Sequence, residues 1–296
     1  MKNSLSVLII ALMAAAPAYS REGVEVGNAS GLRKLVPAEG LENSATQQYK
    51  QMLQSAAQQK ALGPDNHPQV VRLRTIAQKL IPFALPWNER SPKWNWEVNL
   101  IGSKQINAFC MPGGKIAFYT GILDQLKLTD DEVAMIMGHE IAHALREHAR
   151  ERMAKSTGTD ILLRGGAAIL GLGQLGDMAA AGASNLLKLK YGRDDETEAD
   201  LVGMELAARA GYDPRSGVIL WQKMASASKG APPQWLSTHP KGVTRIQDIE
   251  KNLPKVMPLF ARARGVDEKR LPAYKSNLDE LNKAPTATAS DAAQPR

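Results

Sequence analysis

Cysteine is almost absent from this sequence of 296 residues, in which Cys110 is the only one. A single cysteine cannot form an internal disulfide bond, so disulfides do not hold the fold together. A chain of this length can bury a sizeable core without them, and 44% of its residues are hydrophobic. That content excludes disorder of the whole chain. The sequence therefore predicts one folded domain with extensions, or two small domains.

The sequence also lacks any run of lysine and arginine and any basic stripe interleaved with aromatic residues. Its net charge is +7 and its pI is near 9.4, but the positive charge is spread along the chain. We expect no nucleic acid as a partner, because nucleic-acid-binding domains gather their basic residues on one face. The basic balance is compatible with weak peripheral contact with an anionic membrane surface.

Uncharged runs long enough to span a bilayer are missing as well. The apolar run from Leu5 to Ala16 follows the positive Lys2 and is too short for a spanning helix. Two overlapping small-x-small cleavage sites come next, within residues 16–20. We interpret residues 1–20 as a secretory signal peptide, with an uncleaved anchor as the alternative.

Residues 161–187 are rich in glycine, alanine and leucine, but Arg164 and Asp177 interrupt them. No uncharged stretch of spanning length remains. This pattern favours a buried helical hairpin over one that touches a membrane.

Apolar residues recur at three- and four-residue spacing in several segments, which predicts helices. Apolar and polar residues alternate in three short segments, at 94–100, 106–110 and 116–119, with the turn signal Pro112-Gly113-Gly114 before the last. We expect a small antiparallel sheet that contains a hairpin, and an α+β, mainly helical fold. Residues 21–44 read as an irregular lead-in, and residues 256–296 as a C-terminal extension that is disordered from about 284. The expected helices span residues 45–62, 68–81, 130–154, 196–210, 214–224 and 243–252.

The helix expected at 130–154 begins with a capping box, Thr129 with Glu132, and carries the motif His-Glu-Ile-Ala-His. His139 and His143 are four residues apart, so both project from one helix face and can hold one metal ion. Zinc suits imidazole and carboxylate ligands and brings the pKa of a bound water near neutrality. Glu140 is placed to reach that water and take its proton. This is the arrangement of a zinc hydrolase with one zinc per chain.

A third protein ligand is required, and Glu196 is the best candidate because it completes a His₂Glu site with an open fourth position. Asp200 lies four residues later on the same face and can fix the orientation of a ligand histidine. Glu198 is the rival ligand; otherwise it reads, like Asp195, as part of a solvated acidic run. His148 fails the metzincin spacing, so we interpret it as a surface residue.

Together these segments resemble the HtpX and CAAX-prenyl-protease family of gluzincin zinc metallopeptidases, and especially its soluble periplasmic BepA-like branch. The resemblance covers about residues 45–250 and implies a zincin-like catalytic domain, here at 45–255, with zinc, endopeptidase activity and the Glu196 assignment. Relatives in that branch carry a repeat domain for which this chain ends too soon, so docking through repeats does not carry over. The matching pieces are Asn107-Ala108-Phe109, Pro112-Gly113-Gly114, His139-Glu140-Ile141-Ala142-His143, Glu196-x-x-Ala199-Asp200, His239-Pro240 and Arg245-Ile246.

The resemblance also supplies the expected substrates, misfolded or misassembled proteins of the cell envelope, including outer-membrane and periplasmic proteins. The expected location is then the periplasm, after export across the inner membrane. The family places a histidine-proline loop beside the zinc, so His239 is either an oxyanion donor or a fourth ligand that blocks the metal until the loop moves. Asn107 and Ala108 are the candidate substrate-binding residues, on a strand edge that pairs with an extended peptide.

Two other functions stay open at this point. One is an aminopeptidase or other zinc hydrolase that acts on short peptides, although no acidic group for the substrate amine can be identified. The other is a chaperone-like or adaptor protein whose zinc site is kept latent by His239.

Overall fold

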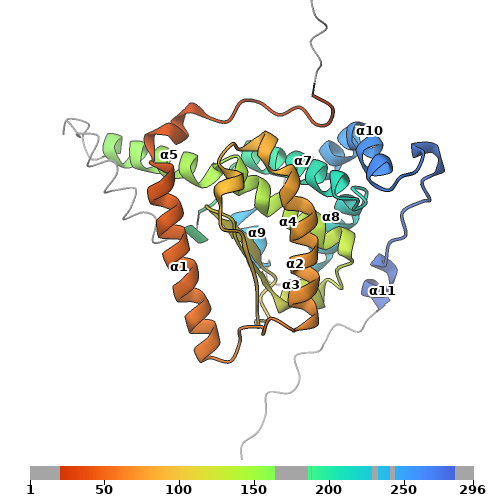
Figure 1. The fold of residues 1–296 in the computed structure, drawn as a ribbon, viewed down its shortest axis with the longest axis horizontal. Coiled ribbons are helices and arrows are strands. Elements are labelled where there is room, and N and C mark those ends of the chain that lie inside the picture. Colours follow the sequence, from red (N-terminus) through yellow and green to blue (C-terminus); the bar gives the residue numbers. More distant parts are fainter. Residues whose placement is uncertain (1–20, 164–185, 188, 229–232, 241–243, 284–296) are drawn as a thin grey trace, which may run out of the picture.

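The computed structural model describes residues 21–163, 186–187, 189–228, 233–240 and 244–283. The predicted signal peptide, most of the predicted hairpin at 161–187 and the tail from 284 lie outside the described residues. The described part is mainly helical with one small sheet, as predicted (Figure 1). None of the described helices combines the length and apolar character needed to cross a membrane.

The elements follow the predicted order, with shifted ends. The first predicted helix begins earlier, at Ala38, and the segment before it contains a 3-10 helix, so residues 21–44 are not wholly irregular. The helices are α1 (Ala38–Gln58), α2 (Pro68–Leu80), α3 (Thr120–Gln125), α4 (Asp130–Leu145), α5 (His148–Leu163), α7 (Arg193–Arg209), α8 (Ser216–Ala227), α9 (Gln234–Thr238), α10 (Arg245–Ala263) and α11 (Leu278–Lys283). The 3-10 helices are η1 (Gly31–Leu35), η2 (Ile81–Phe83), η3 (Leu85–Trp87), η4 (Ser91–Lys93) and η6 (Glu268–Arg270), and the strands are β1 (Glu97–Ile101), β2 (Ala108–Met111) and β3 (Lys115–Tyr119).

The predicted antiparallel sheet is in fact mixed. β2 and β3 form the predicted hairpin, but β1 lies on the far side of β3 and runs parallel to it, in the order β1-β3-β2. Alternation of apolar residues identifies a strand without naming its neighbour, which is why the sequence missed this pairing. The hairpin turn uses Gly113 and Gly114 at positive φ, and a Cβ on Gly114 would lie 2.6 Å from the ring of Trp96. The order leaves β2 at an edge of the sheet.

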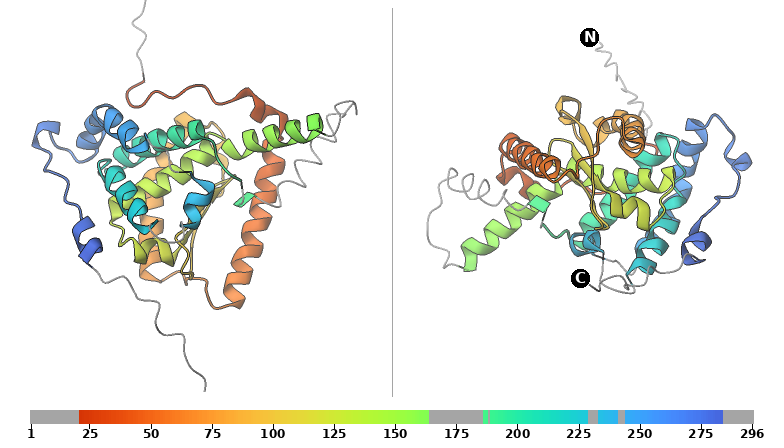
Figure 2. Two further views of the ribbon diagram at one scale, coloured as in Figure 1. Left: turned by 180° about the vertical axis from the view of Figure 1, so that it is seen from behind. Right: turned by 90° about the horizontal axis from the view of Figure 1, so that it is seen from below.

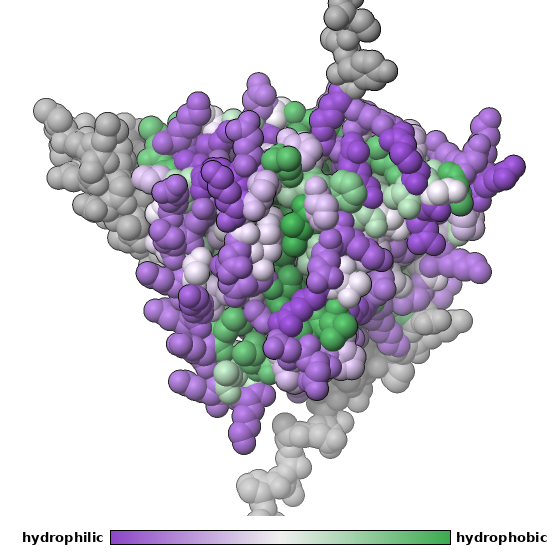
Figure 3. Space-filling model, viewed as in Figure 1, coloured by the Kyte–Doolittle hydropathy of each residue, from purple (hydrophilic) through white to green (hydrophobic). Residues whose placement is uncertain are grey.

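The two faces of the sheet bury different partners. Ala108, Cys110 and Ile116 belong to the main core with α4, whereas Phe109 and Ala117 belong to a smaller core under α1. This division follows from the alternation of side chains along a strand. The sheet thus lies between α1 and the helices of the main core, and Figure 2 shows α4 and α7 side by side in that layer. On the face of Figure 1, hydrophobic side chains gather in a strip between α1 and α2 within a mostly hydrophilic surface (Figure 3).

Helix α4 begins as the sequence predicts and ends earlier. The hydroxyl of Thr129 accepts the N–H of Glu132, whose carboxylate accepts the N–H of Thr129. The predicted single helix at 130–154 is wrong, because α4 ends at Leu145 and α5 starts at His148. Glu147 at the junction has φ 58°, in the left-handed region. No glycine or proline marks this break, so the sequence pattern gives no signal of it.

Two glycines bring α4 and α7 into backbone contact. A Cβ on Gly138 would lie 2.6 Å from the carbonyl oxygen of Gly203, and a Cβ on Gly203 would lie 2.5 Å from the backbone nitrogen of His139. Real Cβ atoms do not approach so closely, so only glycine fits at either position. This close crossing places α7 directly beside the histidine motif of α4.

The start of α7 also corrects the prediction of a solvated acidic run. Asp195 is buried, its carboxylate accepts the N–H of Gly192 at 2.7 Å, and it pairs with Arg152. It therefore caps α7 and ties it to α5, rather than facing solvent.

Candidate metal centre

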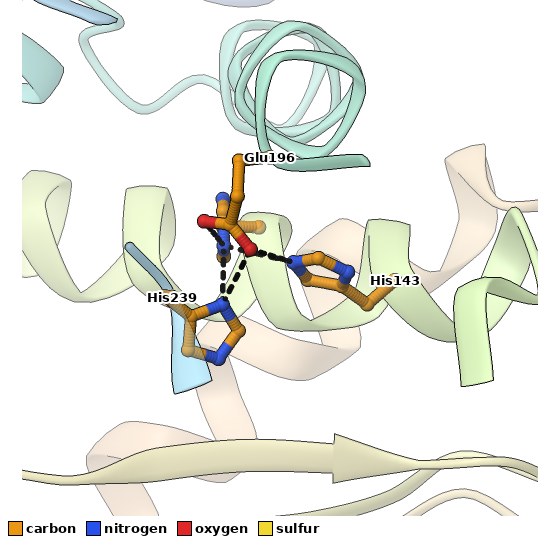
Figure 4. A group of neighbouring side chains, drawn as sticks. His143, Glu196 and His239 are labelled. Atoms are coloured by element: carbon orange, nitrogen blue, oxygen red, sulfur yellow. Dashed lines mark hydrogen bonds and ion pairs between the residues drawn. The ribbon is translucent and has the colours of Figure 1, made fainter. Parts of the chain in front are cut away.

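Four buried side chains from α4, α7 and the segment after α9 converge on one point. The Nε2 atoms of His139 and His143 lie 3.1 Å apart, and Glu196 places its carboxylate oxygens 3.6 Å and 3.3 Å from them, respectively. His239 adds Nδ1, at 3.2 Å from His139 Nε2 and 3.0 Å from Glu196 Oε1. Figure 4 shows Glu196 pointing from its helix toward His143 and His239. These four side chains can hold a metal ion.

The donor set fits zinc on chemical grounds. The outer nitrogen of His139 faces the carboxylate of Asp200 at 3.0 Å, so that nitrogen carries the proton and Nε2 presents a lone pair. His143 and the Glu196 carboxylate face the same point as acceptors. Burial lowers the pKa of His143 well below its usual value despite its hydrogen bond with Glu196, so this ring is neutral. A buried group of acceptors calls for a cation, and a tetrahedral zinc separates its ligand atoms by about 3.3 Å.

Asp200 stands behind His139 as predicted, and Arg245 holds Asp200. The guanidinium of Arg245 donates to both oxygens of Asp200, at 2.6 Å and 2.5 Å, and to Glu196 Oε2 at 2.5 Å. Burial alone would raise the pKa of Asp200, but the charge of Arg245 outweighs it and lowers that pKa. The pKa of Glu196 is also lowered, because hydrogen bonds with His143 and His239 outweigh its burial. Both carboxylates are therefore ionised.

His148 lies behind His143, which overturns its interpretation as a surface residue. Its side chain is 1% exposed, with Nδ1 at 2.9 Å from His143 Nδ1 and Nε2 at 2.9 Å from Glu198 Oε2. Glu198 also pairs with Arg146, so it is neither solvated nor among the metal-facing residues. If Nε2 of His148 donates to Glu198, its Nδ1 can accept from His143, and Nε2 of His143 is then left with a lone pair. The helix break at Glu147 creates this contact, and the sequence does not reveal it.

Glu140 is held beside the cluster by a tryptophan. The indole N–H of Trp235 donates to Glu140 Oε1 at 2.6 Å, and His239 Nε2 lies 3.5 Å from the same oxygen. Glu140 is buried and is absent from the group of metal-facing side chains. Its position beside them, with one oxygen fixed by an indole, suits a general base better than a ligand.

His239 combines two properties. It lies at the end of α9, its side chain is 3% exposed, and it is stacked between neighbouring rings, among them Trp235. Burial would lower its pKa, but the charges of Glu140 and Glu196 raise it above its usual value. The ring therefore has both the position of a fourth ligand and the basicity of a proton donor.

A cleft opens next to the cluster along the edge strand β2. Asn107, Ala108, Glu140 and His239 all line it. The carbonyl of Asn107 accepts the N–H of Tyr119 on β3, at 3.1 Å. Because backbone groups alternate sides along a strand, those of Ala108 face the open edge. The structure thus brings all the predicted site residues to one place.

The sequence predicted no role for three further residues at the site: Tyr191, Trp235 and Arg245. It also predicted, wrongly, that His148 is exposed. Tyr191 stacks on the ring of His143, with ring centroids 3.9 Å apart. In the sequence, Arg245 belongs to a segment that matches the family, without a role of its own. Its position six residues after His239 is the signal in the sequence that could have led to it.

Comparisons with known proteins agree with this geometry. The model of peptidase family M48 matches residues 69–253, more than half of the chain. The mitochondrial metalloendopeptidase OMA1 of Arabidopsis thaliana is 37% identical over 151 residues, which are 51% of this chain and 30% of that protein. The metalloprotease LoiP of Escherichia coli is 29% identical over 196 residues, 65% of this chain and 73% of LoiP. The beta-barrel assembly-enhancing protease of Yersinia pestis is 27% identical over 239 residues, 71% of this chain and 47% of the relative.

The chain spans about a third of the length of the first curated relatives that it matches. The family model nevertheless includes every residue of the metal-facing cluster, together with Glu140, Asp200 and Arg245. The resemblance predicted from the sequence is therefore confirmed. The chain belongs to peptidase family M48.

Proposed function

We propose that this protein is a zinc-dependent endopeptidase. The observation that carries the proposal is the convergence of His139, His143 and Glu196 within 3.1–3.6 Å of one another, with Glu140 at their side and a cleft in front. The similarity to proteins named metalloendopeptidases and metalloprotease supports the same activity. His139, His143 and Glu196 are the proposed ligands of one zinc ion.

Each residue of the site has a separate role in the proposed hydrolysis of a peptide bond. Zinc, when bound, polarises the substrate carbonyl and makes water a stronger acid. Glu140 accepts a proton from the attacking water, with its other oxygen oriented by Trp235. Glu140 then returns the proton to the leaving amine. His239, displaced from the cluster toward the cleft, donates to the oxygen on which negative charge develops.

The edge strand β2 is the proposed binding site for an extended peptide. Backbone groups of Ala108 face the open edge, so a substrate segment can add to the sheet there by main-chain pairing. The N–H of Ala108 is bonded to the side chain of its neighbour Asn107 at 3.0 Å. We propose that Asn107 covers this N–H until a substrate replaces it. Such pairing accepts many sequences, which suits an enzyme that degrades unfolded proteins.

The proposed substrates are misfolded or misassembled proteins of the cell envelope, and the proposed location is the periplasm. The apolar run with cleavage sites at residues 1–20 supports export. The name of the Yersinia pestis relative, a beta-barrel assembly-enhancing protease, supports envelope substrates. The OMA1 relatives carry mitochondrial names, so the export signal is the argument for this compartment. Recovery of the processed protein from the periplasmic fraction of a bacterial host tests it.

Casein cleavage by the purified protein, with and without a zinc chelator, tests the activity. Glu140→Gln is the matched variant, because the amide keeps the shape of the side chain but cannot accept the proton. We expect it to retain zinc and to lose about 10²–10⁴-fold in turnover. Turnover near that of the unchanged protein would remove Glu140 from the mechanism.

The alternative function is a chaperone-like or adaptor protein whose metal site is kept latent by His239. One observation favours it, since His239 Nδ1 occupies the place of a fourth donor in the cluster. His239→Ala separates the two roles. Lost turnover with zinc retained identifies an oxyanion donor, and raised basal turnover identifies a blocking ligand. No casein cleavage by either form, with envelope function unaffected by Glu140→Gln, would favour the adaptor.

A further inference from the structure

A second cleft lies at the C-terminal end of the histidine helix, where α4 meets α5. We call it the basic cleft. It lies between η1, the segment that follows α2, and the α4–α5 junction, and η1 packs beside the start of α5 (Figure 1). Its lining includes five positively charged side chains, those of Arg33, Lys34, Arg90, Arg146 and Arg150.

Negative charge in the basic cleft is scarce. Only Glu89 and Glu147 line it, so five cations face two carboxylates. Three of the arginines share Glu147: Arg33 at 2.9 Å, Arg150 at 2.5 Å and Arg90 at 3.5 Å. Two carboxylates outside the lining neutralise part of the remaining positive charge: Glu42 pairs with Arg90, and Glu198 pairs with Arg146. The excess of cations favours an anionic ligand.

Unpartnered donors point to the same place. Among the described residues, five buried side-chain nitrogen or oxygen atoms have no hydrogen-bond partner, and three of them belong to side chains that line the basic cleft. They are Arg33 Nη1, Arg146 Nε and Trp87 Nε1. The side chain of Arg146 is only 9% exposed. Since a buried donor without an acceptor is costly, three of them at one cleft indicate an acceptor that the protein does not supply.

The backbone at the basic cleft is also held in a costly conformation. Glu147 is not glycine, yet its φ is 58°. Such a conformation is disfavoured for a residue with a side chain and persists where the surroundings determine it. Here the three arginines fix the carboxylate of Glu147. The backbone turn at Glu147 then directs Arg146 and Arg150 to the cleft. The cation cluster is thus built by the fold rather than gathered by chance on a surface.

Exposed leucines accompany the cations. Leu32 and Leu35 belong to η1, the same short helix that supplies Arg33 and Lys34, and are 44% and 49% exposed. Leu85, 54% exposed, lies directly before Pro86, which lines the basic cleft. A free phosphate ion makes no favourable contact with apolar side chains, whereas a membrane lipid presents a phosphate next to acyl chains.

We propose that the basic cleft binds the phosphate of an anionic phospholipid headgroup. Arginine side chains match phosphate oxygens with paired N–H donors, and the unpartnered donors of Arg33 and Arg146 are the groups that would do so. The leucines of η1 then enter the outer part of the lipid layer. The result is a peripheral membrane contact through residues that do not line the peptide cleft.

Co-sedimentation of the purified protein with lipid vesicles tests this proposal. Vesicles of phosphatidylcholine alone are compared with vesicles that also contain phosphatidylglycerol. We expect binding to the second kind, weakened about fivefold for each cation that is removed from the basic cleft. The variants are Lys34→Gln, which changes an exposed side chain, and Arg33→Gln with Lys34→Gln. Because all variants keep the same termini, differences among them report the cleft.

Lys251→Gln with Lys255→Gln is the matched control, since it removes two exposed positive charges from α10, away from the basic cleft. We expect it to change vesicle binding less than about twofold, because salt screens distant surface charges. Equal losses in the control and the cleft variants would overturn the proposal in favour of general charge attraction.

Calorimetric titration with inorganic phosphate separates the lipid from free phosphate. Leu32→Ser with Leu35→Ser should weaken vesicle binding and leave phosphate binding unchanged. Phosphate binding that Lys34→Gln weakens, without binding to either kind of vesicle, would assign the cleft to free phosphate and overturn the lipid assignment.

Discussion

His139 and His143 present their Nε2 atoms to the same point, but the outer nitrogen of each ring meets a different partner. Behind His139 stands Asp200, an ionised carboxylate that Arg245 holds from both oxygens. Behind His143 stands His148, which transmits the contact to Glu198. The first support is direct and charged. The second passes through the imidazole ring of His148.

The difference shows that α4 is held rigidly on the His139 side and is linked to the basic cleft on the His143 side. On the His139 side, Gly138 and Gly203 bring two backbones together and Asp200 and Arg245 are buried, so little can move. On the His143 side, Glu198 is shared with Arg146, whose Nε lacks a partner at the basic cleft. An ion pair and two hydrogen bonds therefore link Arg146 of that cleft, through Glu198 and His148, to His143.

The largest effect is expected where the two supports meet, at Glu196. Glu196→Ala removes a proposed ligand and leaves Arg245 with one carboxylate fewer. Zinc affinity should therefore fall by more than about a hundredfold, which is the upper limit for losing a residue that only supports a ligand. Glu198→Ala should keep the metal. Zinc content of both purified variants, with circular dichroism as the folding control, checks this. Loss of zinc from Glu198→Ala, with zinc retained by Glu196→Ala, would show that Glu198 is the ligand in place of Glu196.

Gly203→Ala should have the next largest effect, because it disrupts the backbone contact between α7 and α4 at His139. The new Cβ would meet the nitrogen of His139 at 2.5 Å, and overpacking of this kind typically costs about 1–3 kcal/mol of unfolding free energy. Denaturant unfolding measures it. Gly27→Ala is the control, since a Cβ there meets nothing within 4 Å. Equal stability of the two variants would show that the helices can separate at no cost.

Asp200→Asn tests the charged support itself. The amide keeps the contact to His139 but loses the negative charge that Arg245 requires, so zinc affinity should fall about a hundredfold. Competition with a chromophoric chelator measures the affinity. An unchanged value would mean that the contact of Asp200 orients the ring without any need for its charge.

His148→Ala should have the smallest effect, about tenfold in zinc affinity, because the carboxylate on that side, Glu198, reaches His143 only through another ring. His148→Gln should restore most of the loss, since glutamine can accept from His143 and donate to Glu198. The same chelator competition serves for both. If His148→Ala weakens zinc as much as Asp200→Asn does, the two histidines are supported equally and the comparison fails.

The sequence by itself determined the chemistry of the site and the start of its helix. Residues four apart on a helix share a face whatever the fold, which paired His139 with His143 and Glu196 with Asp200. The capping box at Thr129 is a local interaction, so it was predicted and confirmed. The hairpin with Gly113 and Gly114 was local in the same sense, and so could also be predicted.

Only the tertiary structure decided what stands behind these residues. The parallel pairing of β1 with β3, the break at Glu147 and the burial of His148 all depend on segments far apart in the sequence. Trp235 reaches Glu140 from 95 positions away, and Arg245 reaches Asp200 from 45. Periodicity and spacing report which face a residue occupies, and packing alone selects the partner that covers that face.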